Sequence, residues 1–325
     1  MDAVSDPSIE TVVVMSSAQV GKTEVINNIT GFHIDQDPAP MLVLLPTVEM
    51  AQAWSKDRLA PMLRDTPALR GRVKAPRSKN SNNTLLHKVF PGGHITMTGA
   101  NAPASLASRP IRIVLCDEVD RYPPSAGTEG DPVSLARKRA TTFWNRKVVL
   151  TSTPTLKGVS RIESEFEISD QRYYHLACPH CGHEQRLHWE NVKWQKDEQG
   201  NHVPESAAYY CGECGSMWTE AERIKAIRNG RWIATRQSKG IAGFHLSELY
   251  SPWSSIEDIV RNFLKAKGNS EPLRAFVNTA LGESWEDRSE QIDQHSIYAR
   301  REEYDADVPE GVLLLTAGID VQRDR

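Results

Sequence analysis

Residues 11–23 read Thr-Val-Val-Val-Met-Ser-Ser-Ala-Gln-Val-Gly-Lys-Thr, an apolar run followed by a short polar loop. The apolar run predicts a buried strand, and the residues after Thr23 have the composition of a helix. A strand, a tight loop and a helix N-terminus direct backbone N–H groups and the helix dipole at one point, where a phosphate group binds. We therefore predict a phosphate-binding loop. Its ATP-binding residues would be Ser16, Ser17, Ala18, Gln19, Val20, Gly21, Lys22 and Thr23.

Two side chains at the end of this loop have chemistry suited to a nucleoside triphosphate. Lys22 would neutralise the β and γ phosphates, and the Thr23 hydroxyl would ligate Mg²⁺. The loop is one glycine short of the usual pattern, because Ser16 stands where a glycine is normal. A solvated turn after a buried strand is the alternative interpretation.

Two further predicted strands end in polar residues. Residues 111–120 form an apolar run that closes on Asp117 and Glu118, the types of residue that serve as magnesium ligand and catalytic base in nucleotide hydrolases. Residues 147–150 form another run, followed by Thr151-Ser-Thr153-Pro. In a doubly wound, mainly parallel α/β sheet these strand ends face one crevice. The alternative for Asp117 and Glu118 is an ordinary acidic turn, but three complementary strand ends in this order favour a nucleotide hydrolase. The same order recurs in helicases and DNA translocases, where the last element, here Thr153, senses the γ-phosphate.

Four of the five cysteines form two Cys-x-x-Cys pairs, Cys178 with Cys181 and Cys211 with Cys214. Such pairs place four thiolates around one Zn²⁺, and four thiolates leave no open position for catalysis. We therefore expect a structural zinc site. The 29 residues between the pairs exceed the usual spacing, and a hairpin with arms at 188–194 and 207–210 would occupy that length. Disulfides are the alternative, but the sequence has no secretory signal.

Length and charge limit the remaining possibilities. A chain of 325 residues is too long for one compact unit, and its net charge of −3 is unlike that of a uniformly basic nucleic-acid-binding protein. Residues 54–79 nevertheless carry eight basic and two acidic side chains, an excess of six, which is either a solvated face or a surface that meets phosphates. No apolar run approaches the roughly 20 residues of a membrane span, so we expect a soluble protein.

The periodicity divides the chain into five parts. We expect an α/β P-loop ATPase core at 1–172, a zinc ribbon at 173–218, a helical segment completing the ATPase region at 219–283, a linker at 284–311 and the first strand of another domain at 312–325. A buried strand is predicted at 41–45, helices at 47–63, 131–144, 219–228, 255–267 and 272–281, and a hairpin at 85–98. The first strand begins close to Met1 and the last strand stands alone, so we expect a fragment truncated at both ends.

These motifs together resemble the large terminase subunit of lambda-type tailed phages. The resemblance rests on the loop at 17–23, Leu115-Cys-Asp-Glu-Val-Asp120, Thr151-Ser-Thr-Pro154, the cysteine pairs, Phe276-Val-Asn-Thr279 with Leu281-Gly-Glu283, Trp285-Glu286, and Gly318-Ile-Asp320. That family joins an ATPase motor to a ribonuclease-H-like endonuclease that cuts viral DNA. The motor drives the DNA into a capsid through the portal.

The resemblance implies several roles and partners. Lys22, Thr23, Asp117 and Glu118 match the ATPase site and Thr151 to Thr153 the coupling element. Asp320 would be the first nuclease carboxylate, binding Mn²⁺ or Mg²⁺, with its companions expected beyond Arg325. The implied partners are double-stranded DNA, the terminase small subunit, the portal protein and further copies of the chain, in the cytoplasm of the bacterial host.

One departure from the family concerns charge. Some terminases carry an arginine in the phosphate loop, where this chain has Ser17, Ala18 and Gln19. Arg109 is a candidate for supplying that charge to a neighbouring subunit, and an ordinary loop arginine is the alternative. Two other functions stay open: a helicase-like DNA-dependent ATPase, and a non-enzymatic zinc-ribbon module that binds DNA or protein.

Overall fold

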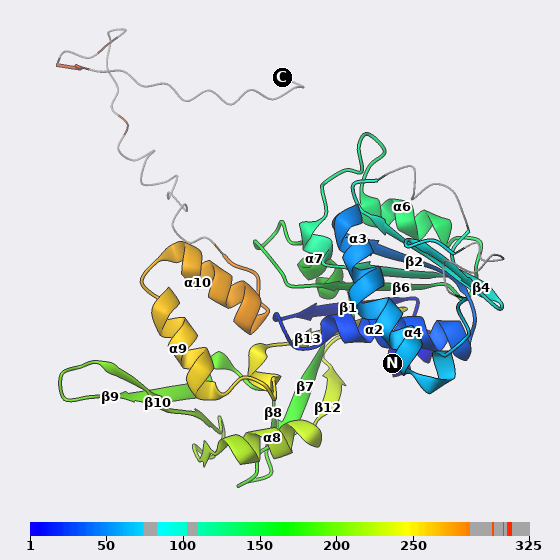
Figure 1. The fold of residues 1–325 in the computed structure, drawn as a ribbon. Coiled ribbons are helices and arrows are strands. Elements are labelled where there is room, and N and C mark those ends of the chain that lie inside the picture. The colour runs from blue at the N-terminus through cyan, green and yellow to red at the C-terminus, as the bar shows by residue number, and fades with distance from the viewer. Residues whose placement is uncertain (75–82, 103–109, 287–300, 302–307, 309–310, 314–325) are drawn as a thin grey trace. The chain divides into compact units, whose positions relative to one another are not determined.

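The computed structural model describes residues 1–74, 83–102, 110–286, 301, 308 and 311–313. The chain divides into two compact units, Met1–Glu286 and Asp287–Arg325. All helices and strands assigned among the described residues belong to the first unit. Figure 1 labels the main ones.

A ten-stranded, mainly parallel sheet forms the core of the first unit. Its strands run in the order β12-β7-β13-β1-β6-β5-β2-β4-β3, with β8 paired to β7. The pairs are parallel from β7 to β4 and antiparallel at β12–β7, β3–β4 and β7–β8. The bounds are β1 Thr11–Ser16, β2 Pro40–Leu45, β3 His87–Phe90, β4 Gly93–Gly99, β5 Ile113–Asp117, β6 Lys147–Ser152, β7 Arg172–Ala177, β8 Glu184–Gln185, β12 Arg231–Ala234 and β13 Ile241–Leu246. The predicted α/β class, the strands at 11–15, 41–45 and 147–150, and the 85–98 hairpin are confirmed.

Helices cover both faces of this sheet, as the alternation along β2 illustrates. Met41 and Val43 pack in one apolar cluster with helix α2, whereas Leu42 and Leu44 pack in another with helices α6 and α7. Central strands buried on both faces read as continuous apolar runs, which is why these strands were visible in the sequence. The helices of this part are α1 Asp2–Ser5, α2 Lys22–Asp35, α3 Val48–Trp54, α4 Ala60–Asp65, α6 Pro132–Arg139 and α7 Arg161–Glu167, with a π-helical turn at Ser55–Leu59 and 3₁₀ turns at Pro67–Leu69 and Val119–Arg121.

The helix predicted at 47–63 exists in segments. Thr47 caps α3 by accepting a hydrogen bond from the backbone N–H of Met50 at 3.3 Å, as its sequence position indicates. The π-helical turn then joins α3 to α4. The helix predicted at 131–144 is shorter than expected, since α6 ends at Arg139.

The cysteine region contains the predicted hairpin. Strands β9 (Val192–Lys196) and β10 (His202–Tyr210) pair antiparallel, with β11 (Met217–Trp218) on the other side of β10 and a 3₁₀ turn at Trp189–Asn191. A register shift between Val203 and Ala208 accommodates the extra residues of β10.

The segment predicted as helical at 219–283 contains the two strands β12 and β13 as well as helices. Helices α8 (Glu220–Arg228), α9 (Ile256–Ala266) and α10 (Ser270–Phe276) were expected, and α8 begins with a capping box of Thr219 and Glu222. A 3₁₀ turn at Glu248–Tyr250 and a π-helical turn at Val277–Leu281 complete it. Strand β13, however, lies beside β1 in the middle of the core sheet. The predicted domain boundaries remain predictions.

Candidate nucleotide and metal sites

The loop between β1 and α2 is held by segments that are distant in sequence. Gln19 and Gly21 have positive φ angles of 58° and 90°, which produce the tight turn before α2. The backbone N–H of Ser17 donates to the carbonyl of Leu246 at 2.8 Å, and that of Ala18 to the carbonyl of Thr279 at 2.7 Å. These two N–H groups are therefore already hydrogen-bonded within the protein. An anion in the loop would accept hydrogen bonds from the backbone N–H groups of the residues that follow Ala18.

Asp117 lies at the end of β5, buried between two hydroxyl groups. Its Oδ1 accepts a hydrogen bond from Thr151 Oγ1 at 2.5 Å, and its Oδ2 accepts one from Thr23 Oγ1 at 3.3 Å. Burial raises the pKa of Asp117, and the Thr151 hydrogen bond opposes that shift. The two oxygen-bearing residues predicted to hold Mg²⁺ therefore lie side by side, and their hard oxygen atoms fit that ion.

The Lys22 ammonium joins the other predicted catalytic residues. Its Nζ donates to Thr153 Oγ1 at 2.5 Å and lies 3.0 Å from Glu118 Oε1. Glu118 has a φ of 57°, a left-handed conformation that is uncommon for residues other than glycine and concentrates at functional sites. The carboxyl ends of β1, β5 and β6 thus bring Lys22, Glu118 and Thr153 together, as the sequence predicted.

A cavity of about 440 Å³ opens over this group. Ala18, Gln19, Gly21, Lys22 and Thr23 line it from the loop, and Glu118 and Thr153 from the strand ends. Five further lining residues were not predicted from the sequence: Glu24, Arg58, Arg121, Trp253 and Thr279. Glu24 directly follows Thr23 and Arg58 belongs to the basic run noted above, but nothing in the sequence indicated that the other three meet the loop.

A smaller cavity of about 190 Å³ adjoins the loop and shares Gly21 and Lys22 with the first. It is largely apolar, and its wall includes Val4 of α1, Val20 and Phe244. Such a surface suits a flat aromatic ring next to the phosphate position.

The motif at 276–286 packs against the strand end that carries Thr153. Asn278 Nδ2 donates to the carbonyls of Thr155 at 2.5 Å and Glu283 at 3.1 Å, and the backbone N–H of Trp285 donates to Thr155 O at 2.9 Å. Gly282 has a φ of +68°, and a Cβ added there would lie 2.7 Å from the backbone nitrogen of Ser17. The nucleotide loop and this motif are therefore in direct backbone contact.

The four paired cysteines converge at one point. All four Sγ atoms lie within 4.8 Å of one another, and Cys178–Cys214 and Cys181–Cys211 are each 3.9 Å apart. A tetrahedron with Zn–S bonds of about 2.3 Å has edges of about 3.8 Å. The thiols are free, and backbone N–H groups of His180 and Glu213 donate to Cys178 and Cys211 at 3.4 Å. The donor set and its spacing fit a zinc ion, and the disulfide alternative is not supported.

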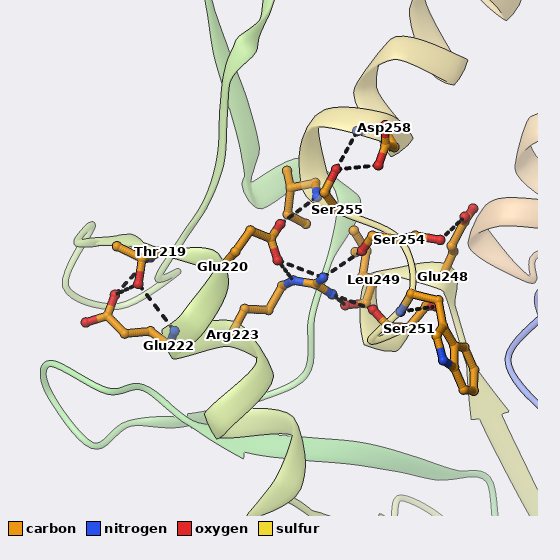
Figure 2. Close-up of polar contacts among 12 residues, drawn as sticks. Thr219, Glu220, Glu222, Arg223, Glu248, Leu249, Ser251, Ser254, Ser255 and Asp258 are labelled. Atoms are coloured by element: carbon orange, nitrogen blue, oxygen red, sulfur yellow. Dashed lines mark hydrogen bonds and ion pairs between the residues drawn. The ribbon is translucent and has the colours of Figure 1, made fainter.

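A buried arginine of helix α8 is hydrogen-bonded to the loop that follows the 3₁₀ turn at Glu248–Tyr250 (Figure 2). The Arg223 side chain, 2% exposed, donates to the carbonyls of Leu249, Ser251 and Ser254 and pairs with Glu220 at 2.8 Å. Glu220 also accepts the N-terminal N–H of α9, from Ile256, at 2.6 Å. These contacts fix the loop that carries Trp253, which lines the cavity.

Two predicted residues, Arg109 and Asp320, lie outside the described residues. So do Arg77 and Lys79 of the basic run. In the described part of that run, three arginines are already paired: Arg58 with Glu24, Arg64 with Asp65, and Arg72 with Asp35. No helix among the described residues has the length and apolarity needed to cross a membrane.

Comparison with known proteins gives consistent matches along the whole chain. Residues 1–232 match the family described as phage terminase large subunit gpA, ATPase domain, and residues 241–325 match the terminase large subunit gpA endonuclease domain. The chain is 31% identical over 355 residues to the terminase large subunit of Enterobacteria phage P21 and 30% identical over 350 residues to that of Escherichia phage lambda. Both alignments cover 100% of this chain and 54% of the relative, so the chain spans about half the length of these relatives.

The fold has a counterpart among solved structures. The large terminase ATPase domain of Thermus phage P74-26 superimposes with a TM-score of 0.50 at 13% identity, covering 86% of this chain and 90% of that chain. At this identity the similarity concerns the fold alone.

Proposed function

The chain belongs to the family of gpA-type phage terminase large subunits, and from this premise we propose that residues 1–286 hydrolyse ATP to drive the translocation of DNA. The observation that carries the proposal is the contact of Lys22 with both Glu118 and Thr153 in the cavity above the loop. Phosphoryl transfer needs mainly positioning and electrostatic stabilisation, which this arrangement of charges offers.

Each of these residues has a distinct role. Lys22 binds the β and γ phosphates, and Glu118 orients the attacking water and accepts its proton. Thr23 and Asp117 would hold Mg²⁺, which neutralises phosphate charge when bound. Because Asp117 already accepts two hydroxyl hydrogen bonds, it is held in place for that role. The apolar cavity beside Val20 and Phe244 receives the adenine ring.

Thr153 links the nucleotide site to the rest of the molecule. It contacts Lys22 directly, and Thr155, two residues further on, accepts hydrogen bonds from Asn278 and Trp285. A change in the position of Lys22 on phosphate release would therefore be transmitted to residues 276–286.

Zn²⁺ held by Cys178, Cys181, Cys211 and Cys214 has a structural role, because four thiolates complete its coordination.

The proposal also covers DNA packaging and DNA cleavage by the whole protein. We infer that the packaged substrate is double-stranded DNA and that several copies act on the portal, with the terminase small subunit as a partner, in the host cytoplasm. An endonuclease dependent on Mg²⁺ or Mn²⁺ would use Asp320.

The test is phosphate release from ATP by the purified chain, with and without linear double-stranded DNA. We expect hydrolysis that DNA stimulates and that Lys22→Ala abolishes together with nucleotide binding. Arg64→Ala, which removes an exposed arginine paired with Asp65 outside the cavity lining, is the matched control. Hydrolysis that survives Lys22→Ala would contradict the proposal, and strand separation by the chain would favour a helicase-like function instead.

A further inference from the structure

The nucleotide loop supplies little positive charge for its proposed reaction. Between Ser16 and Thr23, Lys22 is the only basic residue. During ATP hydrolysis charge develops on the oxygens of the transferring phosphoryl group, and an arginine that meets this charge accelerates the reaction strongly. Two arginines line the cavity above the loop, Arg58 and Arg121.

Arg121 lies at the position where the reaction takes place. Its Nε is 3.7 Å from Glu118 Oε2, while Glu118 Oε1 is 3.0 Å from Lys22 Nζ. The carboxylate that orients the attacking water therefore has a cation on either side. The γ-phosphoryl group would lie one water molecule away from Glu118, because the attacking oxygen must come within about 3.5 Å of the phosphorus. The long side chain of Arg121, which lines the same cavity, starts beside this position.

The backbone of Arg121 is fixed whereas its side chain is available. Asp120 anchors the 3₁₀ turn: its N–H donates to Ser152 Oγ at 3.2 Å, and its carboxylate accepts from Ile162 N at 2.7 Å and Thr155 Oγ1 at 2.9 Å. The Arg121 side chain is 65% exposed, and Glu118 is its one ion-pair partner among the described residues. An exposed guanidinium on a fixed backbone, whose only ion pair is the 3.7 Å contact with Glu118 among the described residues, can turn toward a bound substrate.

Arg58 is placed differently. Its Nη1 lies 3.5 Å from Glu24, the residue after Thr23, so its charge is partly neutralised at the start of α2. No contact of Arg58 with Glu118 exists in the described structure. Of the two arginines, the geometry therefore favours Arg121 as the partner of the γ-phosphate.

We propose that Arg121 is a catalytic residue that contacts the γ-phosphoryl group of ATP in the same chain. This inference rests on the proposed ATPase function and identifies a charge-stabilising residue for it. In the reaction the water oxygen bonds to the γ-phosphorus while the bond from phosphorus to the β–γ bridging oxygen breaks. The electron pair of that bond stays on ADP, and the proton of the water passes to Glu118. Arg121 hydrogen-bonds the equatorial oxygens of the transferring group and exchanges no proton.

The experiment compares Arg121→Ala and Arg121→Lys with Arg231→Ala. Arg231 is a matched control because it is 70% exposed, pairs with Glu184 and lies outside the cavity lining. We expect Arg121→Ala to lower kcat by about 10²- to 10³-fold with KM changed less than about threefold, and Arg121→Lys to recover part of the loss. The effect should not depend on protein concentration, because the arginine acts within its own chain.

A binding measurement separates this inference from the proposed function. The affinity of each variant for ADP and for ADP with aluminium fluoride, a mimic of the transferring phosphoryl group, requires no turnover. We expect Arg121→Ala to weaken binding of the fluoride complex by about 10²-fold and of ADP by less than about threefold. Equal affinities of wild type and Arg121→Ala for the fluoride complex would overturn the inference, as would an equal loss for both ligands. A wild-type chain that binds the complex but does not hydrolyse ATP would refute the proposed function alone.

Discussion

Gly282→Ala should damage the nucleotide site from outside it. Gly282 ends the π-helical turn Val277–Leu281 with a φ of +68°. A Cβ at this position would lie 2.7 Å from the Ser17 nitrogen, 3.0 Å from the Ser16 carbonyl carbon and 3.1 Å from the Leu246 oxygen. These neighbours are backbone atoms, so the loop itself must move.

The free-energy cost of Gly282→Ala is the sum of two contributions. The left-handed conformation costs alanine about 1 kcal/mol relative to glycine. Displacing tightly packed backbone adds roughly 1–3 kcal/mol. Because the N–H groups of Ser17 and Ala18 are bonded to Leu246 and Thr279, the displacement falls on the phosphate loop. We expect nucleotide affinity to fall about 10- to 100-fold, since about 1.4 kcal/mol corresponds to a factor of ten.

The assay is titration with a fluorescent ATP analogue, together with denaturant unfolding. Gly200→Ala is the matched control, because Gly200 has a φ of +83° with no atom within 4 Å of the added Cβ. Gly200→Ala places alanine in the left-handed conformation, as Gly282→Ala does, but its Cβ contacts no other atom. It should therefore lower the free energy of unfolding by about 1 kcal/mol and leave nucleotide affinity unchanged. Wild-type affinity and stability in Gly282→Ala would refute the reasoning.

Three further predictions concern the zinc site, the buried Arg223 and the nuclease region. Protein purified without a His tag should contain about one zinc ion per chain. Cys181→Ser should remove this zinc ion, whereas Cys116→Ser should not. Metal analysis that finds no zinc in the wild type would exclude the site. Arg223→Met should lower the free energy of unfolding by about 2–4 kcal/mol, because it leaves three buried carbonyls without their hydrogen-bond donor. Arg228→Met, at an exposed position of the same helix, should change it by less than about 0.5 kcal/mol. Equal unfolding curves for the two variants would contradict this prediction. Asp320→Ala should abolish Mn²⁺-dependent cleavage of plasmid DNA by the protein, and cleavage that survives Asp320→Ala would disprove the assignment.

The sequence was sufficient for features that depend on local pattern. Continuous apolar runs marked β1, β2 and β6, and the residues that follow such strands had to meet at one edge of the sheet. The contact of Lys22 with Glu118 and Thr153, and the convergence of the four cysteines, follow from that reasoning.

Features that depend on long-range pairing were not predictable. Strand β13 has six residues and contains Gly243, and its place beside β1 is set by packing: a Cβ on Gly243 would meet Ser169 Oγ at 1.9 Å. Trp253 and Thr279 reach the cavity through segments that no local motif connects to the loop. Arg121 follows the acidic pair closely, but only the 3₁₀ turn shows that its side chain returns to Glu118.

The most direct test of the account uses Glu118→Gln in a single sample. Binding of ATP and its single-turnover hydrolysis would be measured on the same preparation, beside the wild type. The account predicts that the variant binds ATP within about threefold of the wild type and hydrolyses it at least about 100-fold more slowly, because the amide cannot accept the proton of the attacking water. Hydrolysis at the wild-type rate by Glu118→Gln would contradict the claim that this cavity is the catalytic centre of an ATPase.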